Sequence, residues 1–174
     1  VGYRALKTLN AGAEGYNVAV GYAAGLAMTT GAQNAILGAS AGDSLTEGSF
    51  NTVLGAFALA TSADGDYNTA VGYKALQDYE DGNGNGHNTA VGSKSQLNAS
   101  TGEFNTSLGS LSMGVGVTTG DYNVALGAEA GQALTSGGLN TLVGGKAGDA
   151  LTTGGSNTAV GYRALTAEDG HGLN

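Results

Sequence analysis

The chain has 174 residues, of which 33 are glycine, and it contains no proline, cysteine or tryptophan. This composition is unlike that of an ordinary packed domain, and the lack of cysteine excludes disulfides and thiolate metal sites. The net charge of −8 argues against sequence-independent nucleic-acid binding, and no apolar run reaches the length of about 18 residues that would predict a membrane-spanning helix.

Near copies of one short stretch, Asn-Thr-Ala-Val-Gly, follow one another along the chain, and Asn157 to Gly161 is the clearest of them. The asparagines that open the copies are Asn17, Asn34, Asn51, Asn68, Asn88, Asn105, Asn123, Asn140 and Asn157, with Asn174 opening one more. Successive anchors are 17, 17, 17, 20, 17, 18, 17, 17 and 17 residues apart. Such a period predicts one stacked structural unit per repeat, because a disordered glycine-rich chain has no fixed register.

Three further positions of the repeat keep one residue type. A glycine stands four residues after each anchor: Gly21, Gly38, Gly55, Gly72, Gly92, Gly109, Gly127, Gly144 and Gly161. A large aliphatic residue precedes each glycine: Val20, Leu37, Leu54, Val71, Val91, Leu108, Leu126, Val143 and Val160. A small residue stands three positions after it: Ala24, Ala41, Ala58, Ala75, Ser95, Ser112, Ala130, Ala147 and Ala164.

The two ends of the chain both fall inside the repeat. The first six residues, Val1 to Leu6, are identical to Val160 to Leu165, and Asn174 is the first residue of a further copy. Terminal repeats of natural arrays are usually atypical caps with a polar outer face. We therefore expect residues 1–174 to be a single repeat array, an internal fragment of a longer fibrous protein.

The repeat predicts an all-β fold, a β-solenoid or parallel β-roll of about ten 17-residue coils. Asn-Thr-Ala-Val-Gly is short, rich in β-branched residues and closed by glycine, as expected of one strand per coil. We expect a second strand around Ala-Leu or Ala-Gly, and turns at segments such as 29–31. With ~4.8 Å between coils, ten coils would form a rod of roughly 45 to 50 Å.

Alternation along the strand places Thr158, Val160 and Tyr162 on one face and Asn157 and Ala159 on the other. We expect the aliphatic column to fill the core and the small-residue column to let partner chains approach. Two interpretations of the asparagines stay open: a hydrogen-bonded amide ladder between coils, or a left-handed turn before each strand. The strand-ending glycine predicts either a positive-φ corner or a close approach of neighbouring backbone.

These repeats, Asn-Thr-Ala-Val-Gly-Tyr-x-Ala-Leu with Thr-Thr-Gly spacers, resemble those of phage tail-fibre and tail-spike shafts. They are also similar to the head repeats of trimeric autotransporter adhesins, the left-handed parallel β-roll family, although that family has a shorter Ala-Ile-Gly pattern. The resemblance covers essentially the whole chain. It implies a homotrimer of parallel β-rolls outside the cell, on a virion tail fibre or a bacterial surface.

We therefore expect a non-enzymatic fibre shaft or adhesin segment that positions a receptor-binding tip. Its partners would be copies of itself, and a cell-surface receptor or glycan bound by regions outside this segment; we expect no nucleic acid and no membrane insertion. One alternative is a subunit of an extracellular filament that assembles end to end. Another is an ice-binding solenoid, in which Val18, Ala35 and Val124 interrupt a column of threonines: Thr52, Thr69, Thr89, Thr106, Thr141 and Thr158.

The polar residues with catalytic potential do not form a recognisable set. The two histidines, His87 and His171, precede anchors in turns and have no nucleophile in a matching repeat position. Paired carboxylates, Asp64 with Asp66 and Glu168 with Asp169, lie on glycine-containing turns, where nothing would raise a pKa for acid catalysis. We expect no catalytic residues and no cofactor. A polysaccharide-degrading spike would need its carboxylates gathered on one face.

The single 20-residue step carries an insertion in which Asp81, Asn83 and Asn85 precede Gly86. Oxygen ligands at alternate positions before a glycine match the first half of a calcium loop. The bidentate glutamate expected at the twelfth position is missing, because Gly92 stands there. We expect a protruding loop, with a weak or neighbour-completed calcium site at Asp81, Asn83 and Asn85 as the alternative.

Overall fold

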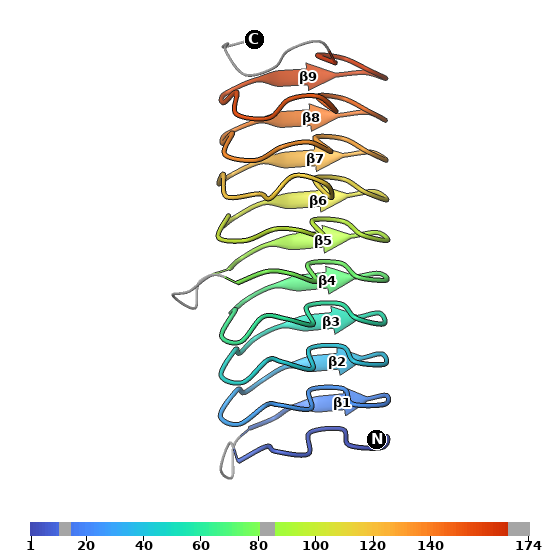
Figure 1. Ribbon diagram of the computed structural model, residues 1–174, viewed down its shortest axis with the longest axis vertical. Coiled ribbons are helices and arrows are strands. Elements are labelled where there is room, and N and C mark those ends of the chain that lie inside the picture. Colours follow the sequence, from blue (N-terminus) through green and yellow to red (C-terminus); the bar gives the residue numbers. More distant parts are fainter. Residues whose placement is uncertain (11–14, 81–85, 167–174) are drawn as a thin grey trace.

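The computed structural model describes residues 1–10, 15–80 and 86–166 and shows a parallel β-solenoid (Figure 1). Nine strands of three residues each form one parallel sheet in chain order, so the described part makes about eight complete turns rather than the ten coils expected. The strands are β1 (Val18–Val20), β2 (Ala35–Leu37), β3 (Thr52–Leu54), β4 (Thr69–Val71), β5 (Thr89–Val91), β6 (Thr106–Leu108), β7 (Val124–Leu126), β8 (Thr141–Val143) and β9 (Thr158–Val160).

Equivalent residues of every repeat pair with one another, whatever the length of the coil between them. Thr69 of β4 pairs with Thr89 of β5 across the 20-residue step in the same register that Thr52 of β3 has with Thr69 across 17 residues. The first residues of the chain stack beneath β1, since the N–H of Gly21 donates to the carbonyl of Val1. No helix in the described ranges is long and apolar enough to cross a bilayer.

Each described coil contains one strand, so the expected second strand around Ala-Leu or Ala-Gly is wrong. In that segment every second residue has a positive φ, as at Lys74 (59°) and Leu76 (50°), which breaks the extended geometry that a strand requires. The coils still bond to each other there, because the N–H of Leu76 donates to the carbonyl of Ser95 at 3.1 Å. The back of the roll is therefore a hydrogen-bonded stack of turns.

The faces of the strands are the reverse of those expected. The middle residue of every strand is buried, whereas the aliphatic residue that ends each strand lies on the outside and is 38% exposed at Val20 and 53% exposed at Leu108. The buried column consists of Ala19, Ile36, Val53, Ala70, Ala90, Ser107, Ala125, Leu142 and Ala159. The roll is thin, so side chains from both walls must share one layer of space, and small residues on the strands leave room for larger ones opposite.

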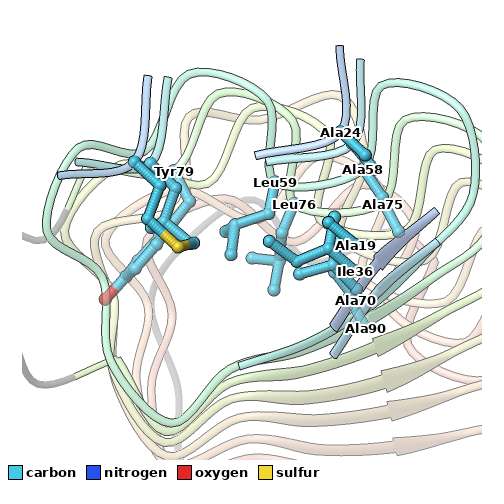
Figure 2. Close-up of a cluster of buried hydrophobic side chains, with 14 of the residues drawn as sticks. Ala19, Ala24, Ile36, Ala58, Leu59, Ala70, Ala75, Leu76, Tyr79 and Ala90 are labelled. Carbon is cyan, nitrogen blue, oxygen red and sulfur yellow. The ribbon is translucent and has the colours of Figure 1, made fainter. Parts of the chain in front are cut away.

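The expected partner-facing role of the small-residue column is also wrong, because Ala24, Ala58 and Ala75 are fully buried inside the roll. Figure 2 shows them on the segment across the interior from the strand residues. These side chains are small because the two walls meet closely there, so they serve the packing of a single chain.

In several coils the interior shows an exchange of volume between two positions, and Figure 2 shows the case of Ala70 and Leu76. Where the strand residue is large, as at Leu142, the residue four positions after the strand-ending glycine is Gly148, and a Cβ there would lie 2.9 Å from a Leu142 methyl carbon. Where the strand residue is Ala70, the same position holds the buried Leu76. In these coils a large residue at one position goes with a small one at the other. Where both are small, as at Ala125 and Gly131, Leu142 of the next coil fills the space.

Two apolar clusters fill the roll, and polar side chains separate them. One cluster runs from Ala19 to Ala99 and the other from Met113 to Ala159. Between them Gln96 donates to the hydroxyl of Ser107 at 2.8 Å, and Ser107 shares a hydrogen bond with Ser95. The Oε1 atom of Gln96 has no hydrogen-bond partner among the described residues. The core is weakest at this level, since a buried polar atom without a partner costs about 1–3 kcal/mol.

The exchange of volume predicts the outcome of a pair of substitutions. Ala70→Leu alone should overpack the layer against Leu76 and destabilise the fold by about 1–3 kcal/mol. Adding Leu76→Gly recreates the pairing of Leu142 with Gly148, so the double variant should recover most of the lost stability. Urea unfolding followed by circular dichroism measures both variants. A double variant less stable than Ala70→Leu would contradict this account of the core.

Candidate interaction surface

The coils are held together inside by a continuous ladder of the anchor asparagines. In each of the eight steps from Asn17 to Asn157, the backbone N–H of one anchor donates to the side-chain oxygen of the anchor below, at 2.8–3.1 Å. In most coils the side-chain nitrogen also donates to the carbonyl of a glycine in the same coil, at 2.7–2.9 Å. The ladder therefore ties each coil both to its neighbour and to itself.

The left-handed conformation, which was the alternative explanation for the asparagines, occurs instead at the residue before the anchor. Tyr16, Tyr67 and Leu139 have φ values of 45°, 56° and 62°, whereas none of the anchors from Asn17 to Asn157 has a positive φ. One anchor departs from the pattern: the Nδ2 atom of Asn68 has no hydrogen-bond partner among the described residues. The coil that Asn68 opens is the 20-residue one, so this gap accompanies the insertion.

Both roles expected for the strand-ending glycine are confirmed. Gly72 has a φ of +133°, which side chains rarely adopt, and a Cβ there would lie 2.5 Å from the carbonyl oxygen of Gly92 in the next coil. The same geometry recurs from Gly2 to Gly144. Because the corners of successive coils touch through backbone atoms, they leave no space for a side chain.

Removing one anchor side chain tests the contribution of the asparagine ladder to stability. Asn105→Ala should leave the N–H of Asn123 and the carbonyl of Gly120 buried without partners, at a cost of about 3 kcal/mol in the free energy of unfolding. The control is Asn98→Ala, because the Asn98 amide is bonded to Val115 at the exposed surface and should cost less than ~0.5 kcal/mol. Equal effects in chemical unfolding would contradict a special role for the anchors.

The outer side of the sheet is a long, uncharged surface, here called the sheet face. It consists of the first and third residues of all nine strands, so a column of mainly threonine runs beside a column of aliphatic residues. Six aliphatic residues on it are 38% to 70% exposed: Val18, Val20, Leu37, Leu54, Leu108 and Val160. Nine strands at ~4.8 Å spacing make this surface roughly 40 Å long. An exposed apolar surface of this extent is typical of an interaction site.

A stack of five rings runs along the edge where the chain enters the strands. Each ring belongs to the residue before an anchor, and together they form the ring ladder: Phe50, Tyr67, His87, Phe104 and Tyr122. Neighbouring ring centroids are 4.7–5.0 Å apart and the rings are parallel to within 6°. Each such pair contributes about 0.5–1.5 kcal/mol beyond its buried area. The ring faces are occupied by each other, so only ring edges and polar atoms meet solvent.

The ring ladder is not among the features predicted from the sequence. The sequence predicts His87 only as a turn residue, yet its imidazole is stacked between Tyr67 and Phe104. The signal was present in the position before the anchor, which is a ring in five successive coils. Because coils are spaced by about one ring-stacking distance, a ring repeated at one position predicts a stack.

The two edges of the sheet face carry opposite charges. Beyond the strand ends, the position two residues after each glycine carries five of the chain's six cations; this basic edge is Arg4, Lys74, Lys94, Lys146 and Arg163. The one carboxylate in that column, Glu129, pairs with Lys146 at 3.1 Å. Before the strands, the turns that lead into the anchors carry carboxylates and, within the described ranges, no lysine or arginine; this acidic edge is Glu47, Asp64, Asp66, Glu103 and Asp121.

Two of the acidic edge carboxylates are held by the coil below. Asp66 accepts a hydrogen bond from the N–H of Ser49 at 2.6 Å, and Asp121 accepts one from Glu103 at 2.9 Å. Burial raises the pKa of Asp66 above its ordinary value, the Ser49 hydrogen bond opposes this, and the charge of Asp64 adds to it. Burial likewise raises the pKa of Asp43 on the back of the roll. The fixed carboxylates give this edge a defined geometry.

Most residues singled out for chemistry lie apart from one another or outside the described ranges. Asp81, Asn83 and Asn85, the calcium candidates, are outside those ranges, as are His171, Glu168 and Asp169. Residues 1–10, 15–80 and 86–166 contain no group of three potential metal ligands and no pocket. The calcium site stays a prediction, and the arrangement that the structure does bring together is the sheet face with its two charged edges.

The described fold is that of a parallel β-solenoid. Comparisons of the chain with family models, with curated proteins and with solved structures gave no match.

Proposed function

We propose that this chain is a segment of a structural fibre shaft and that it assembles with copies of itself through the sheet face. The observation that carries the proposal is the aliphatic column, which runs unbroken along nine strands on the outside of the roll. The sheet face is roughly 40 Å long and, at ~3.3 Å per residue over three residues, about 10 Å wide, so it covers on the order of 400 Å² per copy; with the ring ladder and the turns that border it, the contact can approach the ~800 Å² per partner of a standard interface. Such a surface is better buried against a partner than left in water.

The number of copies and the location come from the repeats that this chain resembles. Tail-fibre shafts and autotransporter heads imply three parallel rolls, outside the cell, on a virion or a bacterial surface. Three sheet faces around one axis would enclose their aliphatic columns and leave the turns outside. A receptor-binding tip would then belong to regions beyond this segment, since repeated coils present the same surface at every level and form no unique pocket.

Substitutions at exposed and at buried strand residues test the proposal. The double variant Leu37→Asp/Leu108→Asp alters only exposed side chains, so the circular dichroism of the fold should persist while sedimentation shows a shift from trimer to monomer. The matched control is Leu142→Asp, in which the same change falls on a buried strand residue and should unfold the chain.

A parent chain that sediments as a monomer at all concentrations would overturn the proposal. An oligomer that survives Leu37→Asp/Leu108→Asp unchanged would show that the interface lies elsewhere on the roll.

Ice binding is the second candidate, and the exposure of the threonines favours it. Six threonines stand on the sheet face, which is flat, rigid and repeats at ~4.8 Å. The alternation of the sequence predicts that the threonines share a face with the aliphatic column, and the structure places both columns on the outside.

For an ice-binding protein, thermal hysteresis should be measurable with the parent chain. It should fall sharply in Thr89→Lys, because a long charged side chain disrupts the flat surface, and it should persist in Asp149→Lys, which changes the charge away from the sheet face. Ice growth unaffected by the parent chain would exclude this candidate.

A further inference from the structure

We propose that the charged edges of the sheet face fix the direction of self-association: the basic edge of one copy lies against the acidic edge of the next, so that copies associate in parallel. This inference rests on the proposed function. It goes beyond it by naming the side chains that select one orientation over the other.

The aliphatic column alone does not distinguish orientations. It is uncharged and similar at every level, so a partner can lie on it in either direction. Burial of the five exposed members of the column, Val20, Leu37, Leu54, Leu108 and Val160, favours association, and the loss of translational and rotational freedom opposes it. Interactions at the borders of the column therefore decide which arrangement forms.

Charge is segregated across the sheet face. Figure 1 shows that the chain enters every strand on one side of the molecule and leaves on the other. The acidic edge therefore borders one side of the sheet face and the basic edge the other, along the length of the rod. The strands between them contain no charged residue.

Symmetry then determines which edges meet. Rotation about an axis parallel to the rod, whether two-fold or three-fold, brings the edge after the strands of one copy to the edge before the strands of its neighbour, so cations meet carboxylates. A two-fold axis that makes the rods antiparallel places each edge against its own equivalent. Five carboxylates would then face five carboxylates, and like charges juxtaposed across an interface disfavour that arrangement.

The levels of two lysines match those of carboxylates. Lys74 is the third residue after β4 and Lys94 the third after β5, while Asp64 precedes β4 and Glu103 precedes β6. In a parallel assembly in register, these lysines lie within about one coil of a carboxylate of the neighbour. The acidic edge presents its carboxylates beside the ring ladder, whose occupied faces exclude a cation, so carboxylate oxygens and tyrosine hydroxyls are the acceptors that remain.

The relative orientation of associated copies can be measured with spin labels on introduced cysteines, because the chain has no cysteine of its own. Thr52→Cys on β3 and Thr141→Cys on β8 are made separately in the full chain and spin-labelled. In a parallel assembly, labels at Thr52 lie close to each other, and so do labels at Thr141. In an antiparallel assembly, only a mixture of the two labelled chains shows a short distance.

Reversing the charges tests whether the named residues of the two edges contribute to association. Lys74→Glu/Lys94→Glu and Asp64→Lys/Glu103→Lys should each weaken association about tenfold or more and remove its weakening by salt, because opposite charges become like charges. All four changes together restore complementarity and should restore affinity. The control Asp78→Lys/Asp149→Lys changes as many charges on the back of the roll and should leave affinity close to the parent's.

The two proposals fail in different ways. A monomeric parent overturns the fibre-shaft assembly itself. A parent that associates with short distances only between Thr52 and Thr141 labels overturns parallel association and leaves the sheet face as the interface. Parallel association that the edge reversals do not weaken, or that the fourfold variant does not recover, overturns the role of the charged edges.

Discussion

Everything in this structure depends on the fixed rise of one strand spacing between coils. Backbone hydrogen bonds impose that rise on the strands, and the asparagine ladder imposes it on the interior, because one side-chain oxygen receives the N–H of the anchor above it. The glycine corners then have to be bare, since backbone meets backbone there at contact distance. A ring repeated at one position has to stack, and a charge repeated at one position has to form a line. Surface properties that would be scattered in a globular domain become continuous stripes.

The sequence predicted the repeat, the strand position and the glycine corner, because each follows from a column that tolerates one residue type. It did not predict which side of the strand lies inside. Both alternating sets, Asn157 with Ala159 and Thr158 with Val160, are uncharged, and hydrophobicity alone favours placing valine in the core. The interior of so thin a roll is shared by two walls, and the wall opposite the strands supplies large side chains such as Leu76 and Tyr79. Only knowledge of that wall decides the assignment.

The ring ladder on the surface crosses the levels at which the interior has polar interruptions. The polar interruption of the core at Gln96 and Ser107 lies at levels that the ring ladder crosses on the surface, and so does the unsatisfied amide of Asn68. The stacked rings join the coils on both sides of these weak levels. The ring ladder and the charged edges are not visible in any one repeat, because each appears only when the repeats are aligned in columns.

Repeat length and rod geometry are independent in this fold. Coils of 17, 18 and 20 residues all deliver the next strand at the same height, because the pairing of β4 with β5 and of β6 with β7 keeps the common register. The extra residue of the 18-residue coil falls where the N–H groups of Val115 and Gly116 both donate to the carbonyl of Gln132, away from the strands. Because the strand register does not depend on coil length, a rod of this kind can display different loops at heights set by counting coils.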